Sequence, residues 1–290
     1  MGIRLKSNKK IDVRRDFLLK NLNTFKIGGR ASYFFIAHSI DELQRIIKKE
    51  KDFYFLGGGS NLLISDSSID KPIVTLGEEF SFIERQDNTT LIVGAMTPLS
   101  KLISYAIGKS LKGLEELVGI PATIGGMTVM NASAFGKEFS SLVEEVVVFT
   151  KEGEIKHIGK DEIKFGYHYS SLKEYIIIKV KIKLQEAAGI KDSIGLYLRQ
   201  RLAYQDFMFP SAGCIFKNPP YVSVGLLIER CFLKGFRVGD AQISLKHANF
   251  IINRGKAKTK DVIYLISVIK ERVYDRFGIY LEEEVVRWGC

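Results

Sequence analysis

The feature that most constrains this chain is a segment of small residues, 119–136, with the sequence GIPATIGGMTVMNASAFG. Glycine, alanine, serine and threonine make up more than half of it. We do not expect a packed helix or strand to use so many side chains with so little apolar surface to bury. Glycines let a backbone approach a neighbouring group closely. The segment therefore suits a backbone wrapped around a flat or phosphorylated ligand, and the alternative is a close-packed crossing of two chain segments.

A second glycine cluster, residues 57–62 with the sequence GGGSNL, follows an apolar segment, 53–56, that we expect to be a short buried strand. Glycines there permit positive φ angles and bring backbone N–H groups close to an anion. The cluster is not a dinucleotide fingerprint, because Leu62 occupies the third glycine position of G-x-G-x-x-G, and no G-K-[ST] follows it. Alone, it fits an ordinary tight turn as well as a phosphate cradle.

The composition indicates a folded protein of two or three domains. The chain has 290 residues, of which 46% are hydrophobic and 26% charged. A disordered chain lacks the apolar residues to offset the entropy of ordering, and domains usually hold about 100–200 residues. No apolar stretch reaches the roughly 20 residues that a membrane span needs. We therefore expect no membrane association.

The net charge of +10 is unevenly placed. Residues 1–20 contain seven Lys or Arg residues and two Asp residues, so half of the excess lies in this short segment. We interpret residues 1–19 as a basic, solvated N-terminal arm, and an arm that binds nucleic acid is the alternative. The chain has no zinc-finger spacing and no RNA-binding aromatic motif. The prediction is therefore that nucleic acid is not a partner.

The cysteines and histidines indicate a reducing compartment and no metal site. The three cysteines form no C-x-x-C pair, and a chain of this length does not need disulfides to fold. The four histidines are scattered, with no H-x-x-x-H or H-E-x-x-H spacing. We expect a cytoplasmic protein, most simply a monomer, without a bound metal.

Hydrophobic periodicity predicts a mixture of helices and strands along the whole chain. The expected helices lie near 40–50, from Pro98 to about 110, and near 191–204, 223–233 and 260–276. The expected strands lie near 53–56, 71–76, 90–95, 143–150, 154–158, 178–184, 250–252 and 280–281. Strands 143–150 and 154–158 flank a hairpin turn, and strand 178–184 has one lysine-rich, solvated face.

Taken together, eight blocks in order resemble the UDP-N-acetylenolpyruvoylglucosamine reductase (MurB) family, flavoenzymes of peptidoglycan synthesis. The blocks are residues 23–29, 57–62, 119–136, 167–170, 211–219, 225–229, 239–249 and 281–285. The resemblance covers about residues 21–289. It implies an α+β chain with a two-subdomain FAD-binding fold of the vanillyl-alcohol-oxidase (PCMH) type, over residues 20–80 and 81–188, and a C-terminal α+β substrate-binding domain, 189–290. The length is similar to that of the shorter form of the family, without an extra substrate-covering loop.

The resemblance also implies the reaction. NADPH reduces FAD, and the reduced flavin then reduces the enolpyruvyl group of UDP-N-acetylglucosamine-enolpyruvate to give UDP-N-acetylmuramate. The redox chemistry belongs to the flavin, and the protein supplies binding, orientation and electrostatics. Both glycine segments would then hold FAD, through Gly57, Gly58, Gly59, Ser60, Asn61, Leu62, Gly119, Ile120, Pro121, Ala122, Thr123, Gly125, Gly126, Asn131, Ala132 and Gly136.

Three positions match the catalytic residues of the family. Cys214 stands where the family usually has a serine that donates the proton, and a thiol is the stronger acid of the two. His168 stands where the family has an arginine that polarises the substrate carboxylate, and an imidazole lacks the bidentate fork. Either His168 performs that task or another cation such as Lys217 helps. Glu284 matches the family's C-terminal glutamate because Leu281 and Val285 frame it.

The substrate contacts implied by the matching blocks are Tyr204, Gln205, Lys217, Asn218 and His247. Two other functions remain open. One is a different FAD oxidoreductase of the same fold. The other is a non-catalytic basic binding protein, which stays open because position 168 is a histidine where the family has an arginine.

Overall fold

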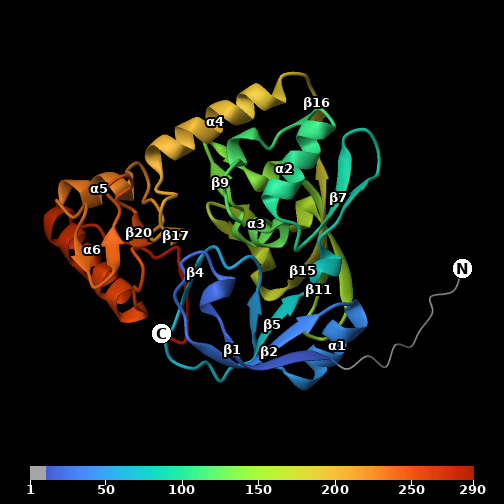
Figure 1. Ribbon diagram of the computed structural model, residues 1–290. Coiled ribbons are helices and arrows are strands. Elements are labelled where there is room, and N and C mark those ends of the chain that lie inside the picture. The colour runs from blue at the N-terminus through green and yellow to red at the C-terminus, as the bar shows by residue number, and fades with distance from the viewer. Residues whose placement is uncertain (1–10) are drawn as a thin grey trace, which may run out of the picture.

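The computed structural model describes residues 11–290 and shows three connected parts with a helix lying across them (Figure 1). The α+β fold expected from the sequence is confirmed, and each predicted helix is present. The helices are α1 (Ile40–Lys49), α2 (Leu99–Gly108), α3 (Ile124–Met130), α4 (Ile190–Tyr204), α5 (Val224–Arg230) and α6 (Thr259–Phe277). The domain boundaries at 19/20, 80/81 and 188/189 stay a prediction.

The first part is a four-stranded sheet with the order β1-β2-β5-β3. Its strands are β1 (Asp12–Leu18), β2 (Arg30–Ala37), β5 (Ile73–Leu76) and β3 (Tyr54–Leu56). Strands β2, β5 and β3 run parallel, and β1 is an antiparallel edge strand. The prediction of a solvated arm over residues 1–19 is therefore wrong for residues 12–18. The basic side chains of β1 are solvated while its backbone pairs with β2, a common property of edge strands. The prediction is wrong for Leu19 as well, which is fully buried, and residues 1–10 of the predicted arm lie outside the described residues.

The second part is a five-stranded sheet with the order β12-β11-β15-β7-β6. The strands are β6 (Ile83–Arg85), β7 (Thr90–Gly94), β11 (Val143–Phe149), β12 (Ile155–Gly159) and β15 (Ile176–Lys183). The predicted hairpin is confirmed as the antiparallel pair β11 and β12. Along β15, Val180 and Ile182 are buried while Lys181 and Lys183 lie near Glu144, so the solvated lysine face is confirmed as well.

The third part packs α5 and α6 against a sheet with the order β17-β20-β19-β18. Its strands are β17 (Ser211–Cys214), β18 (Arg237–Val238), β19 (Ala241–Ile243) and β20 (Phe250–Asn253). Phe25, Ile27 and Leu63, from early in the chain, are buried in the same hydrophobic cluster as Ile228 and Ile266. This shared core fixes the third part against the first.

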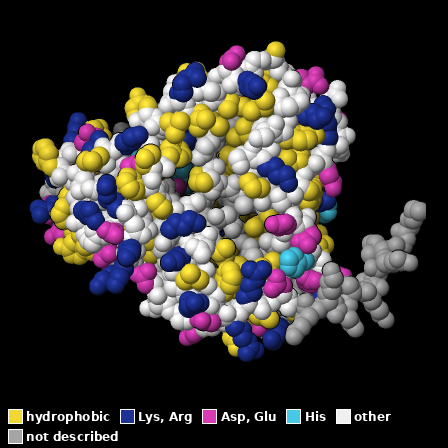
Figure 2. Space-filling model, in the orientation of Figure 1, with side chains coloured by type: hydrophobic (Ala, Val, Ile, Leu, Met, Phe, Trp, Pro, Cys, Tyr) yellow, Lys and Arg dark blue, Asp and Glu magenta, His cyan; other side chains and the backbone are white. Residues whose placement is uncertain are grey.

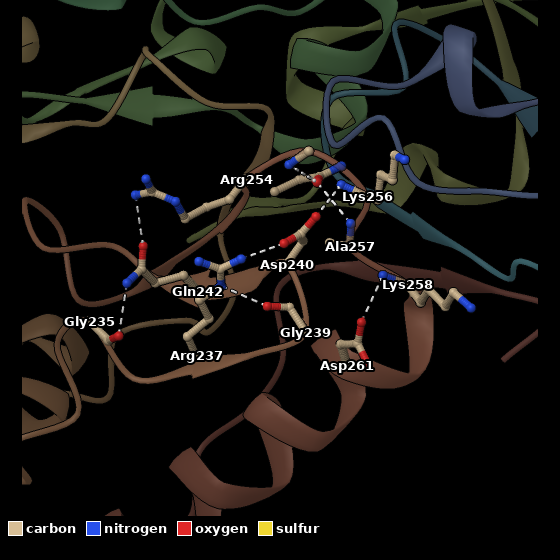
Figure 3. A network of polar contacts seen from close by, with 12 residues as sticks. Gly235, Arg237, Gly239, Asp240, Gln242, Arg254, Lys256, Ala257, Lys258 and Asp261 are labelled. Atoms are coloured by element: carbon tan, nitrogen blue, oxygen red, sulfur yellow. Dashed lines mark hydrogen bonds and ion pairs between the residues drawn. The ribbon is translucent and has the colours of Figure 1, made fainter.

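A polar network fixes the loop between β20 and α6 (Figure 3). The Asp240 carboxylate accepts hydrogen bonds from the Lys256 amide at 2.8 Å and from the Arg237 guanidinium at 2.5 Å. Both interactions lower the pKa of Asp240. The Asn253 side chain accepts bonds from the amides of Gly255 and Ala257, and donates to the Phe25 carbonyl at 3.1 Å. The network therefore joins the third part to a turn in the first.

The C-terminal tail returns to the first part. The prediction of a strand at 280–281 is wrong, because Tyr280 is 81% exposed and the chain there pairs with no strand of the described part. The strand of the tail is instead β21 (Val286–Trp288), which pairs in parallel with β4 (Leu62–Ile64). Trp288 stacks on Tyr54 with ring centroids 4.7 Å apart. This pairing brings the glutamates before β21 beside the glycine turn before β4.

In the described range, 11–290, no helix has the length and apolar character needed to cross a membrane.

Candidate active site

A cavity of about 540 Å³ lies where the three parts meet, and Figure 2 shows the molecule hollowed there. Ligand cavities of roughly 300–1,000 Å³ are typical of small-molecule sites. Both glycine segments line it, together with His168, Arg201, Gln205, Cys214 and Glu284. The sequence separates these residues by more than 200 positions, so the three-part fold is what brings them together.

The glycine turn 57–62 connects β3 to β4 and lines one wall of the cavity. Gly59 has φ +66°, and a Cβ there would lie 2.1 Å from the Leu22 carbonyl oxygen, so only glycine fits. In the described part of the chain, the amides of 57–61 donate to no backbone carbonyl or side chain. Free backbone amides in a glycine turn are suitable donors for a phosphate group.

The segment 119–136 forms a second wall, although the expectation that it holds no helix is wrong. Residues 124–130 form the short helix α3, which buries Ile124 and Met127 in the core while its small residues permit close packing. A Cβ on Gly125 would lie 3.0 Å from the Ala95 Cβ, and one on Gly58 would lie 3.2 Å from the Thr123 amide. Both interpretations of segment 119–136 are therefore correct. It packs closely against the turn 57–62, and both segments line the cavity.

Two of the predicted cofactor residues in this segment lie away from the cavity wall. Asn131 is fully buried with φ +43°, and its side chain donates to Glu138 and to the Gly166 carbonyl and accepts from the Ser140 amide. Its role in the structure is to hold the turn after α3. Gly136 lies in a turn with φ +79° and no atom within 4 Å of its Cβ position. The prediction of cofactor contact is not supported at these two positions.

Cys214 reaches the cavity because of an irregularity in β17. The register of β17 against β20 shifts between Ser211 and Cys214, and Gly213 has φ +79° within the shift. A bulge of this kind re-aims the side chains that follow it, and glycine accepts the φ angle without strain. The sequence Ser-Ala-Gly-Cys thus places the thiol on the cavity wall.

The electrostatic surroundings keep the Cys214 thiol protonated. Burial, and secondarily the negative charge of Glu284, raise the pKa of Cys214 to about 12, although the positive charge of Arg201 opposes both. A free cysteine has a pKa of about 8.5. The thiol is therefore protonated at neutral pH and can act as an acid, whereas a nucleophile would have to be a thiolate.

His168 and Glu284 form a pair beside the thiol. Their Nδ1 and Oε1 atoms are 3.2 Å apart, and the two side chains are only 16% and 13% exposed. His168 has φ +47° and packs edge-on against the Tyr167 ring. Two residues that are 116 positions apart thus place an imidazole and a carboxylate on one side of the cavity.

The three consecutive glutamates of the tail have different partners. Glu282 pairs with Lys217 and Glu283 with Lys270 and Arg287, and only Glu284 lines the cavity. The backbone fixes this frame, because the Glu284 amide donates to the Ile215 carbonyl at 2.8 Å and its carbonyl accepts from the Asn61 side chain at 3.0 Å. Asn61 therefore links the glycine turn directly to the glutamate.

Of the five predicted substrate residues, only Gln205 lines the cavity. Asn218 donates to the Tyr167 hydroxyl at 3.2 Å and accepts from the Val224 amide, so it stands next to the His168 turn. Lys217 pairs with Glu282 outside the cavity wall, so the structure does not supply it as a replacement for the family's arginine. The remaining two, Tyr204 and His247, also lie outside the wall, Tyr204 with 68% exposure.

The surroundings of His247 indicate a structural role for this residue. Its ring packs on Phe250 with centroids 4.6 Å apart, its Nδ1 has no hydrogen-bond partner in the described part, and burial lowers its pKa. A neutral imidazole is therefore favoured at this position, which suits an apolar contact better than an anion contact.

Sequence analysis did not single out Arg201, which the structure places in the cavity wall. The residue is only 7% exposed, and its Nη1 donates to the side-chain Oε1 of Gln205 at 3.1 Å. The one available signal was the four-residue spacing to Gln205, which puts both on the same face of α4. Composition could not single out this arginine among the chain's 43 basic residues.

The residues present fit FAD. The unpartnered amides of 57–61 and the buried, unpartnered Thr123 hydroxyl supply donors for a pyrophosphate on one side. Apolar side chains of the wall, such as Ile120, Met127 and Ile177, supply a surface for a flat ring. A glycine cradle with apolar walls and few polar groups has the donor set that a large dinucleotide requires.

Comparison with known families agrees with this geometry. A family model described as "FAD binding domain" matches residues 31–159, and one described as "UDP-N-acetylenolpyruvoylglucosamine reductase, C-terminal domain" matches residues 203–288. The first covers the two glycine segments. The second covers β17, where Cys214 lies, and the tail with Glu284.

Whole-chain comparisons give the same result. A UDP-N-acetylenolpyruvoylglucosamine reductase of Caldicellulosiruptor saccharolyticus is 39% identical over 285 residues, which are 95% of this chain and 91% of the relative. The reductase of Thermotoga maritima is 38% identical over 91% of this chain and 95% of the relative. The crystal structure of the reductase (MurB) from Thermus caldophilus superposes with a TM-score of 0.84 at 36% identity, covering 96% of this chain and 99% of that one. This chain belongs to the UDP-N-acetylenolpyruvoylglucosamine reductase family.

Proposed function

We propose that this protein reduces UDP-N-acetylglucosamine-enolpyruvate to UDP-N-acetylmuramate with Cys214 as proton donor and Glu284 and His168 as its partners at the reacting carbon. FAD is the cofactor and NADPH the reductant, as in the reductases of this family. The observation that carries the proposal is the convergence of these three side chains on a cavity whose other walls are the two glycine segments.

FAD supplies the redox chemistry, transfer of two electrons and a proton equivalent from NADPH to the substrate double bond. The residues that would hold it are those of the two glycine segments that line the cavity. They are Gly57, Gly58, Gly59, Ser60, Asn61, Leu62, Gly119, Ile120, Pro121, Ala122, Thr123, Gly125, Gly126 and Ala132.

Cys214 delivers the proton at C2 of the substrate. A pKa of about 12 makes this thiol a weaker acid than a free cysteine, yet a stronger acid than an aliphatic hydroxyl. Proton transfer to a carbanion-like centre is favourable from such an acid. The thiol also remains protonated at neutral pH, so every catalytic cycle begins with the proton on Cys214.

Glu284 and His168 hold the charges around that centre. The carboxylate of Glu284 lies close enough to the thiol that its negative charge makes Cys214 harder to ionise. His168, 3.2 Å from Glu284, offers its other ring nitrogen to the substrate carboxylate. In this arrangement the imidazole takes the position of the family's arginine, and Glu284 orients it.

Other features are consistent with a small-molecule enzyme. The cysteines Cys214, Cys231 and Cys290 are all free, which agrees with the reducing cytoplasm that we propose as its location. We also propose that the enzyme acts as a monomer without nucleic acid or membrane partners, and that Asn218 and Lys217 contact the nucleotide of the substrate at the cavity mouth.

Product analysis in deuterated water tests the proposal. The protein, loaded with FAD and given NADPH and UDP-N-acetylglucosamine-enolpyruvate, is expected to form UDP-N-acetylmuramate that carries solvent deuterium at C2, the carbon that Cys214 would protonate. A flavin that NADPH reduces but that leaves this substrate unchanged would indicate a different FAD oxidoreductase. A protein that takes up no flavin and retains nucleic acid would indicate a non-catalytic binder.

A further inference from the structure

Thr24 joins the glycine turn of the first part to the strand of the third part that carries the thiol. Its backbone amide donates to the Gly59 carbonyl at 3.1 Å, so the residue is fixed against the glycine turn. Its hydroxyl donates to the carbonyl of Ser211, the first residue of β17, at 2.7 Å. Thr24 and Ser211 are 187 positions apart, and both line the cavity. One residue therefore connects the proposed flavin cradle to the strand of Cys214.

The hydroxyl of Thr24 has a single proton to donate, and the distances favour Ser211 as the acceptor. The Ser60 carbonyl oxygen lies 3.3 Å from the hydroxyl, whereas the Ser211 carbonyl oxygen lies at 2.7 Å, the usual length of an O–H···O bond. Ser60 belongs to the glycine turn, so a bond to it would stay within the first part. The shorter bond is the one that joins the two parts.

The residues on either side of Thr24 are firmly held. Asn23 is 2% exposed, and its side-chain amide donates to the carbonyls of Leu19 at 3.1 Å and Ile27 at 2.9 Å. Phe25 is fully buried in the hydrophobic cluster of the third part. A side chain whose neighbours are fixed by packing and hydrogen bonds has a defined position of its own. Thr24 therefore sets the separation between the glycine turn and β17.

The bond from Thr24 reaches β17 where the strand becomes irregular. The register shift that aims the thiol lies between Ser211 and Cys214, so the Ser211 carbonyl is at one end of the bulge. The tail has a separate link to the glycine turn, through the bond from Asn61 to the Glu284 carbonyl. The bond from Thr24 thus acts on the position of the thiol, and the bond from Asn61 on that of the carboxylate.

We propose that Thr24 is a positioning residue for the proton transfer, which holds the Cys214 thiol at its working distance from the flavin in the cradle. The inference rests on the proposed function. In the second half of that reaction, the substrate double bond accepts a hydride from the reduced flavin at C3 and the thiol proton at C2. Oxidised FAD is left, and solvent returns a proton to Cys214. The first half, hydride transfer from NADPH to FAD, does not use the thiol.

The test measures the two halves separately in Thr24→Val, which replaces the hydroxyl with a methyl group of similar size. The full-length protein is reconstituted with FAD. Anaerobic stopped-flow absorption then gives the rate of flavin reduction by NADPH and, in a second mixing step, the rate of reoxidation by UDP-N-acetylglucosamine-enolpyruvate. Thr259→Val is the matched control. The Thr259 hydroxyl also joins the third part to the first, through a bond to the Ile64 carbonyl at 2.7 Å, and does not line the cavity.

Thr24→Val is expected to reoxidise its flavin at least about tenfold more slowly than the wild type, because a displacement of about 1 Å in a reacting group costs up to 10²-fold in rate. Its FAD affinity and reduction rate should stay within about twofold of the wild type, since the backbone bond to Gly59 does not depend on the side chain. Thr259→Val should match the wild type in both halves, and Thr24→Ser should recover most of the reoxidation rate because it keeps the hydroxyl.

Equal slowing of both halves, an unchanged reoxidation rate, or the same selective loss in Thr259→Val would overturn the inference. Failure of the proposed function would be distinct, since this substrate would then not reoxidise the wild-type flavin at all. Thr24→Ala keeps the measurement possible if the valine variant does not fold. Alanine also lacks the hydroxyl but places no methyl group against the Ser211 carbonyl, so the same selective loss is expected. Wild-type reoxidation in a folded, FAD-loaded Thr24→Ala protein would also contradict the inference.

Discussion

The imidazole of His168 lies 3.2 Å from the carboxylate of Glu284, on the wall of a cavity that also contains the Cys214 thiol. His168 lies in a turn that precedes β15 of the second part, and Glu284 lies in the C-terminal tail. The tail reaches the site because β21 pairs with β4. In the proposed mechanism, this pairing lets Glu284 orient the imidazole of His168.

Removing the imidazole is expected to impair catalysis. His168→Ala should lower kcat by about 10²–10³-fold, as loss of a preorganised donor to developing charge usually does. His168→Arg should restore much of the turnover, because a guanidinium also donates hydrogen bonds and presents a bidentate fork to a carboxylate. Steady-state kinetics from pH 5.5 to pH 9 would measure both. Unchanged kcat and pH profile in His168→Ala would contradict a catalytic role.

The thiol is expected to be the proton donor. Cys214→Ala should lower kcat by about 10²–10⁴-fold, the usual contribution of a general acid, whereas Cys214→Ser should keep much of the turnover because a hydroxyl occupies the same place. Cys231→Ala on α5's C-terminal side is the matched control and should behave as the wild type. Near-normal turnover in Cys214→Ala would remove this residue from the mechanism.

The raised pKa of Cys214 predicts a pH dependence of its own. Because the folded-state pKa of about 12 exceeds the 8.5 of a free thiol, the donor stays protonated as the pH rises through 8.5, and no loss of activity there is due to it. In the same range the unfolded chain releases this proton and the folded chain does not, so folding stability falls with rising pH relative to Cys214→Ser. Thermal melts of both proteins between pH 7 and pH 10 would show it; parallel curves would contradict the raised pKa.

Three neighbouring glutamates allow a matched comparison. Glu284→Gln should lower kcat by about 10²-fold or more. Glu282→Gln should change kcat by less than about twofold, because it removes only an ion pair with Lys217 near the surface. Glu283→Gln should lower Tm with little effect on kcat, since it removes bonds to Lys270 and Arg287. Equal losses of turnover in the three variants would contradict the assignment of Glu284.

The glycine turn offers a test that does not depend on turnover. Gly59→Ala places a Cβ 2.1 Å from a backbone oxygen at φ +66°, so the turn must move, with a strain of about 1–3 kcal/mol. FAD affinity is expected to fall more than tenfold. Gly108→Ala at the end of α2, where no atom lies within 4 Å, should bind FAD normally. Titration of apoprotein with FAD would measure both, and equal affinities would contradict the cradle.

The sequence predicted every helix except α3, four strands of the five-stranded sheet and the two glycine segments that line the cavity, because these follow from periodicity and from glycine positions. It did not predict β1, where consecutive basic residues such as Arg14 and Arg15 hide an edge strand whose stability comes from pairing with β2. It also placed Asn131 at the cofactor, whereas tertiary contacts turn its side chain into the protein. Arg201 was one of three arginines, with Arg199 and Arg237, that the sequence offered as donors to the substrate, and it could not be singled out because its burial is a property of the fold.

The measurement that tests the central claim most directly is the anaerobic absorption of the bound flavin at about 450 nm, where oxidised flavin absorbs. The account predicts that purified protein shows this band, that one equivalent of NADPH bleaches it, and that one equivalent of UDP-N-acetylglucosamine-enolpyruvate restores it, rapidly in the wild type and slowly in Cys214→Ala. A protein without the band, or a bleached band that this substrate does not restore, would contradict it.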